Sequence, residues 1–319
     1  MDQTKFKFTI FTPTYNREKV LHRVYESLLV QTFTDFEWLI IDDGSTDDTK
    51  QLVEIWLNDP ETWFAIRYYW QPNQHKKVAH NYAVKLAQGE LFLTFDSDDR
   101  CVPQALERFN FHWQQIPSDT RDKFSSIYVL CTDQFGYQIG NSFPGDNFFD
   151  SNTLDIFYKY KIRGEKWGVY RTSILEKFPF PSEATKLPGL IMESLIWNKI
   201  AENYYTRFVN EKLRIYYTNN FSVKNPPMTL KNQIKFNSIS NVYSLNIFLS
   251  SYFTYLTSDP MTFIKVGALI TRFYLHIESH SDLPYLPAGF KQKFWVLLLS
   301  PLGFILYLRD FLREKFGDS

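Results

Sequence analysis

The sequence has no excess charge of either sign, since 35 lysine and arginine residues balance 35 aspartate and glutamate residues among 319. This balance excludes a strongly basic nucleic-acid-binding module and an acidic disordered tail. Cysteine is almost absent, with only Cys101 and Cys131 and no Cys-x-x-Cys pair. We therefore expect a reducing, cytoplasmic setting, and no disulfide-built fold, structural zinc site or nucleic-acid partner.

Glycine and proline are also sparse, at 12 and 15 residues, which excludes a low-complexity polymer. The first residues, MDQTKFKFTIFTPTYNR, contain an early acidic residue and only a short apolar run. We expect neither a signal peptide nor a membrane anchor in this segment. Apolar and aromatic residues are plentiful, at 44% and 18%, which is enough for a substantial core. The aromatic content alone does not distinguish core packing from sugar stacking or a membrane interface.

The first hundred residues alternate between strand-like and helix-like patterns. This alternation predicts an α/β fold with a mostly parallel sheet flanked by helices. The run FEWLII is apolar almost throughout, as in a strand covered on both faces. The expected strands are 6–12, 36–41, 66–70, 90–95 and 127–132, and the expected helices are 17–31, 46–57, 76–88 and 103–115.

Aspartates follow two of these strands at the point where each strand should end. Asp42 and Asp43 follow the second expected strand, and Asp96, Asp98 and Asp99 follow the fourth. The carboxyl ends of parallel strands meet at one sheet edge, so we expect the two groups to converge there. Carboxylates this close repel one another unless a hard cation such as Mg²⁺ or Mn²⁺ lies between them and grips a diphosphate. The alternative is that Asp42 and Asp96 are ordinary turn and cap residues.

Four motifs, in this order, resemble the nucleotide-sugar-binding half of family 2 glycosyltransferases with the GT-A fold. They are Thr-Pro-Thr-Tyr-Asn-Arg at 12–17, Ile-Asp-Asp-Gly-Ser-Thr-Asp at 41–47, Asn-x-x-Lys-x-x-Ala-x-Asn at 73–81 and Phe-Asp-Ser-Asp-Asp at 95–99. The likeness spans roughly residues 5–215. It implies a GT-A type, Rossmann-like sheet, a nucleoside diphosphate sugar donor, inverting transfer, and Mn²⁺ or Mg²⁺ at the Asp-x-Asp motif.

By this resemblance the donor's base, for which uracil is the first choice, packs on Tyr15 and hydrogen-bonds to Asp43. The implied donor-binding residues are Pro13, Thr14, Tyr15, Arg17, Asp43, Lys76, Asp96, Ser97 and Asp98, and the implied metal ligands are Asp96, Asp98 and Asp99. Lys76 would offset diphosphate charge, and the alternative is a solvated loop lysine. His75 and His80 are weaker candidates, because a histidine near a helix start is more often a surface residue than a phosphate donor.

Inverting transfer requires a carboxylate that accepts the proton of the acceptor hydroxyl. The resemblance implies that this acid lies roughly 90 residues after the metal motif, where Glu193 precedes an amphipathic helix. Many relatives have Glu-Asp here, so Ser194 is a departure from the pattern. The alternative for Glu193 is an acid favoured at a helix start by the helix dipole. Glu183 and Glu165 are further candidates for the base.

Trp167 and Trp197 are the expected acceptor-binding residues. Trp167 lies in Gly-Glu-Lys-Trp-Gly-Val-Tyr-Arg, which resembles the family's segment beneath the acceptor site. An indole there can stack on a sugar ring, and the alternative for Trp167 is burial in the core.

The pattern turns helical after about residue 229, which suggests two domains. We expect a glycosyltransferase-like domain at 1–225, with a nucleotide-sugar half at 1–100 and an acceptor half at 101–225, and a helical region at 226–319. The expected function is transfer of a sugar to a saccharide or lipid-linked saccharide in surface polysaccharide or glycoconjugate synthesis. The alternatives are a nucleotidyltransferase, which normally has a glycine-rich loop after the first strand, and a non-catalytic sugar-nucleotide-binding module.

The terminal region contains the apolar run WVLLLSPLGFILYL, 14 residues long and flanked by basic residues. A membrane span needs about 20 such residues, and Pro301 with Gly303 should interrupt the helix, so we expect no span. The aromatic rings and basic flanks favour peripheral contact of 291–315 with the inner face of the plasma membrane. The alternative is docking on the protein's own core or on a second copy in a homo-oligomer.

Overall fold

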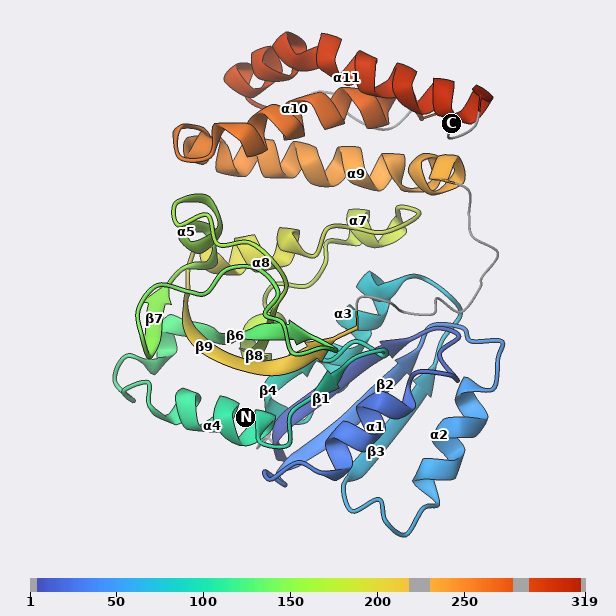
Figure 1. Cartoon of the computed structure of the whole chain (residues 1–319), viewed down its shortest axis with the longest axis vertical. Coiled ribbons are helices and arrows are strands. Elements are labelled where there is room, and N and C mark those ends of the chain that lie inside the picture. The colour runs from blue at the N-terminus through green and yellow to red at the C-terminus, as the bar shows by residue number, and fades with distance from the viewer. Residues whose placement is uncertain (1–4, 218–229, 278–286, 317–319) are drawn as a thin grey trace. The chain divides into compact units, whose positions relative to one another are not determined.

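The computed structural model describes residues 5–217, 230–277 and 287–316 (Figure 1). The chain divides into two compact units. Unit 1 comprises Met1–Pro179 and Ile196–Val223, and unit 2 comprises Phe180–Leu195 and Lys224–Ser319. Each unit has its own set of packed elements and is described by itself below.

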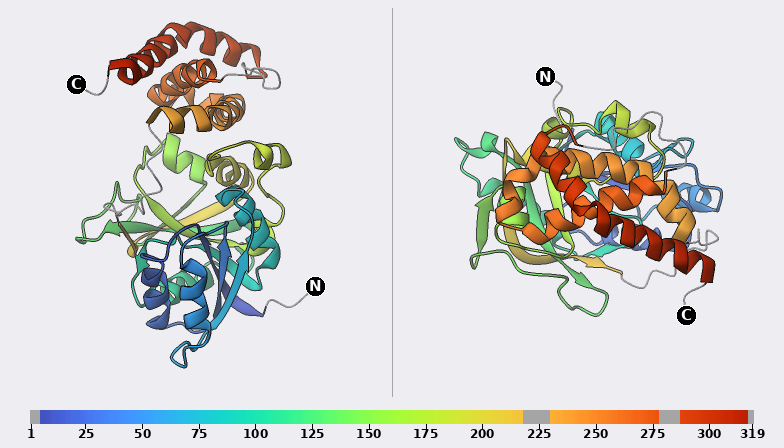
Figure 2. Two further views of the ribbon diagram at one scale, coloured as in Figure 1. Left: turned by 90° about the vertical axis from the view of Figure 1, so that its right-hand side faces the viewer. Right: turned by 90° about the horizontal axis from the view of Figure 1, so that it is seen from above.

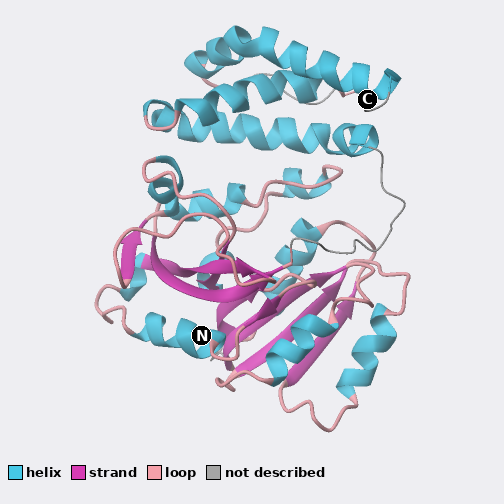
Figure 3. Cartoon of the chain, in the orientation of Figure 1, coloured by secondary structure: helices cyan, strands magenta, loops and turns pink. Residues whose placement is uncertain are grey.

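Unit 1 is built on one mixed sheet, drawn in magenta in Figure 3. The strands are β1 (Phe6–Thr14), β2 (Phe36–Asp42), β3 (Ala65–Trp70), β4 (Gly89–Thr94), β5 (Arg100–Cys101), β6 (Phe124–Asp133), β7 (Phe148–Ser151), β8 (Lys166–Arg171) and β9 (Tyr205–Tyr216). Their order is β3-β2-β1-β4-β8-β6-β9-β5, and β7 pairs with β9. Strands β3, β2, β1 and β4 are all parallel, which confirms the expected α/β fold and mostly parallel sheet.

Helices cover both faces of this sheet. Those of unit 1 are α1 (His22–Leu29), α2 (Thr49–Leu57), α3 (Lys76–Leu86), α4 (Ala105–Gln114), α5 (Thr153–Tyr158) and α6 (Thr172–Leu175), and α8 (Ser194–Ala201) begins at the boundary between the units. Apolar side chains of α1, α2 and α4 share one core with alternate residues of β1, β2 and β4, including Ile10 and Trp38. On the other face, His80 of α3 packs against Phe11 and Phe92.

The second half of the sheet contains more strands than the sequence pattern predicts. The expected strand at 127–132 is β6, but β5, β7, β8 and β9 were not predicted. Strand β8 runs antiparallel to both β4 and β6, and β9 runs parallel to β6 with two shifts of register along the pair and one near its start. Strand β9 pairs along the whole of β6, and β5 pairs with β9 at Arg214 and Ile215.

Unit 2 contains α7 (Ser182–Lys186) and three long helices, α9 (Leu230–Tyr252), α10 (Pro260–Leu275) and α11 (Phe290–Phe316). Figures 1 and 2 show α9, α10 and α11 lying one upon the next. Rings of Phe248 and Phe263 pack between α9 and α10, with centroids 5.3 Å apart. The indole N–H of Trp295 donates to the carbonyl of Phe263 at 2.9 Å and joins α11 to α10.

The prediction that Pro301 and Gly303 interrupt the terminal helix is wrong, because α11 runs through both residues. Proline has no N–H to donate to the carbonyl four residues before it. Here the hydroxyl of Ser300 donates to the carbonyl of Leu297 at 2.8 Å and replaces the missing bond. At Gly303, a Cβ atom would lie 2.4 Å from the carbonyl oxygen of Ala268, so the glycine permits close packing on α10.

Candidate active site

The two groups of aspartates lie at one edge of the sheet. Strand β1 pairs with β2 on one side and with β4 on the other, in registers that set Thr14 beside Asp42 and Phe11 beside Thr94. The N–H of Asp43 donates to the carbonyl of Thr14 at 2.8 Å. The ends of β2 and β4 are therefore two strand spacings apart across the sheet, about 10 Å, and three residues apart along it, which adds an offset of about 10 Å in that direction. This is the convergence that the sequence predicted for parallel strands.

Asp42 and Asp43 have different roles although they are adjacent. Asp42 is fully buried, and its carboxylate accepts hydrogen bonds from the N–H of Ser45 and the hydroxyl of Tyr68. The turn interpretation is therefore correct for Asp42. Asp43 is held through Oδ1, which accepts from the side-chain amide of Gln71 at 2.7 Å and from the N–H of Gln74 at 2.9 Å. These bonds fix the carboxylate and leave Oδ2 for a donor on a ligand.

The residues that follow β1 border the same edge. The Thr14 side chain is buried, and among the described residues its hydroxyl has no hydrogen-bond partner, which is unusual for a buried polar group. Tyr15 is 37% exposed, so part of its ring is open to solvent. The side chain of Asn16, at φ 52°, accepts from the N–H of Thr46 at 2.8 Å and ties this loop to the loop after β2.

Pro13 and Arg17 complete the sequence-predicted residues of this loop. Pro13 lies in β1 opposite Ile41, and the backbone N–H of Arg17 donates to the hydroxyl of Thr49 at 2.9 Å. Both residues are half-buried. The hydrogen bond fixes the Arg17 backbone, so its side chain starts from a defined position beside the Asp43 loop.

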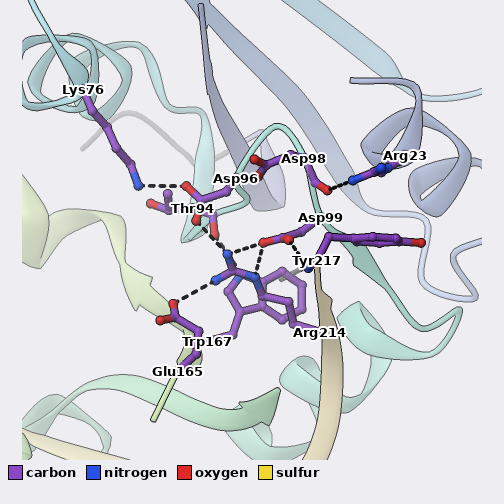
Figure 4. A network of polar contacts seen from close by, with 10 residues as sticks. All are labelled: Arg23, Lys76, Thr94, Asp96, Asp98, Asp99, Glu165, Trp167, Arg214 and Tyr217. Carbon is purple, nitrogen blue, oxygen red and sulfur yellow. Dashed lines mark hydrogen bonds and ion pairs between the residues drawn. The ribbon is translucent and has the colours of Figure 1, made fainter. Parts of the chain in front are cut away.

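Asp96 lies between two cations (Figure 4). Its Oδ1 accepts from Lys76 Nζ at 2.8 Å, and its Oδ2 accepts from Arg214 Nη2 at 2.7 Å. Burial opposes ionisation, but Lys76 and Arg214 outweigh it and hold the pKa of Asp96 well below its usual range. Lys76 is therefore paired with Asp96 and is not a loop lysine surrounded only by solvent. Asp96 is paired with two cations and does not act as an ordinary helix cap.

Asp99 faces into the protein, contrary to the expectation that it binds a metal. It is fully buried; Oδ2 pairs with the guanidinium of Arg214, and Oδ1 accepts from the N–H of Tyr217 at 3.0 Å. Burial raises the pKa of Asp99 to about 6, although Arg214 opposes this shift. Because Asp99 is fully buried with both oxygens engaged, it anchors the turn and is not positioned to bind a metal ion.

The turn at Asp98 is fixed by a hydrogen bond from Arg23 of α1 (Figure 4). Arg23 Nη1 donates to the backbone carbonyl of Asp98 at 2.7 Å, and its guanidinium lies 3.9 Å from the centroid of the Tyr217 ring. Ser97, which lies between Asp96 and Asp98, is buried. The loop that carries the acids is therefore fixed by residues of α1 and of the segment at the end of β9.

The carboxylates fit a divalent ion that takes few protein ligands. Both oxygens of Asp96 and both of Asp99 already accept hydrogen bonds from cations or backbone. Within residues 5–217, 230–277 and 287–316, no group of three metal-ligating side chains could enclose an ion. Mg²⁺ is commonly held by one or two carboxylates together with substrate phosphates and water. Asp98 fits this role, and Asp96 is the second carboxylate that an ion can reach, because its side chain is 33% exposed whereas that of Asp99 is fully buried.

Four residues that hold the acids in place are not marked by any sequence motif: Arg214, Arg23, Tyr217 and Gln71. Arg214 is 3% exposed and also lies 3.4 Å from Glu165. Burial alone would lower the pKa of Arg214, but Asp96 and Asp99 raise it above its ordinary value. No local motif marks Arg214, because it reaches the acids only through the pairing of β9 with β5 and β6.

His80 is a core residue and does not lie at the surface. It is 3% exposed and lies edge-to-face against Phe11, Phe92 and Trp197. Burial, helped by Lys76, lowers the pKa of His80 to about 3, so the ring is neutral near pH 7. His75, at φ 68° just before α3, also has a lowered pKa because of burial and Lys77.

The burial of His80 predicts a measurable acid sensitivity. Between its ordinary pKa of 6.5 and about 3, the unfolded chain binds one more proton at His80 than the folded chain. The contribution of His80 is complete above pH 6.5 and is lost as the pH falls, by up to about 1.4 kcal/mol per pH unit. His80→Leu should flatten the decline of unfolding free energy with falling pH, measured by urea unfolding at several pH values. Parallel pH curves for the two proteins would contradict the assignment.

The two tryptophans differ from the expected acceptor-binding role. Trp167 is 2% exposed, packs on Phe95 and Phe109, and donates from its indole N–H to the carbonyl of Thr94 at 2.8 Å. Its prediction as a sugar-stacking residue is wrong, because no face of the ring reaches solvent. Trp197 is half-buried and stacks on Tyr170 with centroids 4.5 Å apart, so an acceptor role for it stays a prediction.

The candidate bases fall in different units. Glu165 is in unit 1, where its carboxylate lies 3.4 Å from Arg214 and is 44% exposed. Glu193 and Glu183 are in unit 2, Glu193 directly before α8 and Glu183 within α7. The segment that carries Glu193 is fixed to α9, since the N–H of Leu190 donates to the side chain of Asn237 at 2.8 Å.

Comparison with known proteins gives the same assignment of fold. TarS from S. aureus in complex with UDP-GlcNAc aligns with a TM-score of 0.59 at 19% identity, over 98% of this chain and 92% of that chain. A mannosyltransferase from Pyrobaculum calidifontis in complex with GDP-Man and Mn²⁺ aligns with a TM-score of 0.51 at 15% identity, over 96% and 88%. At these identities the likeness concerns the fold, and it confirms the GT-A architecture.

Curated relatives are similar over parts of the chain. A Campylobacter jejuni GalNAc(5)-diNAcBac-PP-undecaprenol beta-1,3-glucosyltransferase is 26% identical over 182 residues, 56% of this chain and 55% of that protein. An Escherichia coli chondroitin synthase is 42% identical over 100 residues, 31% of this chain and 14% of that protein. The chain thus spans less than two thirds of the length of each.

A model of the family described as Glycosyl transferase family 2 matches residues 9–177. The matched segment runs from within β1 to beyond β8 and includes both groups of aspartates, while Arg214 and Glu193 lie outside it. Since the match covers more than half of the residues and contains the acidic edge described above, the chain belongs to glycosyl transferase family 2.

Proposed function

We propose that the protein transfers a sugar, with inversion, from a nucleoside diphosphate sugar to a hydroxyl of a saccharide or lipid-linked saccharide. The observation that carries this proposal is the meeting of Asp43 and the Asp96–Asp98 turn at one edge of the parallel sheet. A UDP-sugar is the first choice of donor, supported by the UDP-GlcNAc complex of TarS. The undecaprenol-linked substrate named for the Campylobacter relative supports a lipid-linked acceptor.

The proposed donor site divides into a base end and a diphosphate end. At the base end, the carboxylate of Asp43 accepts the imide N–H of uracil while the ring packs on Tyr15, and the buried hydroxyl of Thr14 lies on the same edge. At the diphosphate end, Asp98 and Asp96 would hold Mn²⁺ or Mg²⁺, and Lys76 adds positive charge. The ion supplies charge stabilisation for the departing diphosphate.

Glu193 is the proposed general base. Its position relative to the acidic motif in the sequence fits the family pattern, and Ser194 leaves it as the carboxylate of that pair. A carboxylate at this place can accept the proton of the acceptor hydroxyl as that oxygen attacks the anomeric carbon. Glu165, close to Arg214, is the competing candidate within unit 1.

The attachment of the Glu193 segment to α9 gives a prediction. Asn237 accepts from the N–H of Leu190, and the hydroxyl of Ser240 donates to the carbonyl of Pro188. Asn237→Ala should lower kcat roughly tenfold, because a small misplacement of a base is costly, while leaving the donor KM unchanged. Asn237→Asp keeps the accepting oxygen and should restore most of the rate. Equal losses in both variants would contradict this positioning role.

The function is tested by incubating the protein with a panel of sugar nucleotides, Mn²⁺ or Mg²⁺, and saccharide or lipid-linked acceptors. We expect release of nucleoside diphosphate that increases with acceptor and is abolished by EDTA. Release of pyrophosphate with a sugar phosphate substrate would instead identify a nucleotidyltransferase. Stabilisation against heat by nucleotide and Mn²⁺ without any release would identify a binding module.

A further inference from the structure

Helix α11 has two different faces. One face carries large apolar side chains at helical spacing, which we call the outer stripe: Phe290, Phe294, Leu298, Ile305, Leu308 and Leu312. These side chains are between 39% and 84% exposed. Such a long contiguous row of exposed apolar residues is rare on a soluble monomer and marks a contact surface.

The opposite face of α11 is fixed to α10. Val296 is fully buried, and the backbone at Gly303 approaches Ala268 too closely for a side chain. Asp310 accepts from the guanidinium of Arg272 at 2.6 and 3.0 Å, a two-point ion pair. This pairing sets the rotation of α11 about its own axis. The outer stripe therefore cannot turn inward within unit 2 to be covered.

The charges around the outer stripe are positive. Within 290–313 the basic residues are Lys291, Lys293, Arg309 and Arg313, and the single acid is Asp310. Asp310 is buried against Arg272 and also lies 3.6 Å from Arg309, so its charge is offset inside the unit, while the Arg309 side chain is still 49% exposed. Lys291 and Arg309 lie 18 residues apart, five helical turns, so they share the exposed side at either end of the stripe. Cations at the ends of an apolar row match anionic lipid headgroups above hydrocarbon.

The length of the apolar segment favours a helix that lies on a membrane over one that crosses it. By length and composition, Phe290–Arg313 is sufficient for a span. However, the uncharged stretch from Phe294 to Leu308 is 15 residues, or roughly 22 Å of helix, against a hydrocarbon layer of about 30 Å. The inner face is also held to α10 by the Arg272–Asp310 pair, which a spanning helix would carry into lipid.

We propose that the outer stripe of α11 docks unit 2 on an anionic bilayer, with the helix lying in the plane of the interface. The apolar side chains enter the boundary between headgroups and acyl chains, and the flanking lysine and arginine side chains contact lipid phosphates. This contact adds a partner to the proposed glycosyltransferase function and does not depend on the identity of donor or acceptor.

The test is flotation of the full chain with vesicles of phosphatidylcholine and phosphatidylglycerol, compared with phosphatidylcholine alone. We expect binding to the anionic vesicles that weakens with added salt. Ile305→Glu should lower the partition coefficient at least about tenfold, because it places a charge in the stripe. Ile55→Glu is the matched control, since Ile55 on α2 is 64% exposed and Ile305 is 60% exposed. Equal binding by the two variants would overturn the proposal.

The orientation is tested by attaching a spin label to single cysteines at Phe294, Leu298, Ile305 and Leu312. The native thiols of Cys101 and Cys131 are buried, so labelling is confined to the new site. We expect similar shallow depths of the spin label at all four positions, as for a helix in the plane of the interface. Depths that pass through the bilayer centre would overturn the proposed orientation. A wild-type dimer that Ile305→Glu dissociates, with no vesicle binding, would show that a second copy covers the stripe.

Discussion

Replacing Asp98 by Asn is expected to lower kcat/KM for the sugar nucleotide roughly 1,000-fold, which corresponds to about 4 kcal/mol of transition-state stabilisation. The substitution preserves the size of the side chain and removes only its charge. Asp98 lies at the tip of a turn whose neighbours Asp96 and Asp99 are paired with protein cations. The loss should therefore fall on the contact with the metal and diphosphate rather than on the fold.

Steady-state kinetics at several Mn²⁺ concentrations would measure this effect. We expect Asp98→Asn to raise the apparent dissociation constants of both donor and Mn²⁺, with an unchanged unfolding midpoint. Asp119→Asn, the same exchange at an exposed position, serves as the control. If Asp98→Asn retains wild-type affinity for Mn²⁺ and donor, the proposed site is wrong.

Replacing Glu193 by Gln is expected to reduce kcat by roughly 100- to 10,000-fold, the range for loss of a positioned general base. Glutamine retains the shape and one accepting oxygen but cannot take up a proton. The affinity for UDP should stay close to that of the wild type, because Glu193 is not among the proposed donor-binding residues. Loss of rate without loss of nucleotide binding distinguishes the base from a donor-binding residue.

Glu165→Gln is the comparison that decides between the two carboxylates. Glu165 contacts Arg214, which pairs with Asp96, so its replacement should change donor or metal affinity more than kcat. Single-turnover rates and calorimetric titrations of UDP with both variants separate these effects. A large fall in kcat for Glu165→Gln together with full activity of Glu193→Gln would reverse the assignment.

The acidic edge could be predicted because it depends on local patterns. An apolar strand followed by aspartates, repeated in a parallel sheet, places both groups at one edge by topology alone. Which of those acids are used for structural contacts could not be predicted from the pattern. Asp42 closes a local turn with Ser45, but its second oxygen is taken by Tyr68, and Asp99 holds Arg214; Tyr68 and Arg214 are both distant in the chain.

The errors arise where the partners of a side chain decide its role. Trp167 looks like a stacking residue in sequence, but β8 lies between β4 and β6 and is buried on the side of Phe95 and Phe109. The break expected at Pro301 does not occur, because Ser300 replaces the lost hydrogen bond and α10 supports the helix. Arg214 carries no motif, since only the long-range pairing of β9 brings it to Asp96.

The most direct test of the central claim is a crystal structure of the chain with UDP and Mn²⁺. We expect one nucleotide whose uracil N–H donates to Asp43 and whose diphosphate shares the ion with Asp98. We also expect that Asp99 keeps its pair with Arg214 and does not ligate the ion. A nucleotide bound elsewhere, or one that contacts Asp43 while the ion sits away from Asp98, would contradict it.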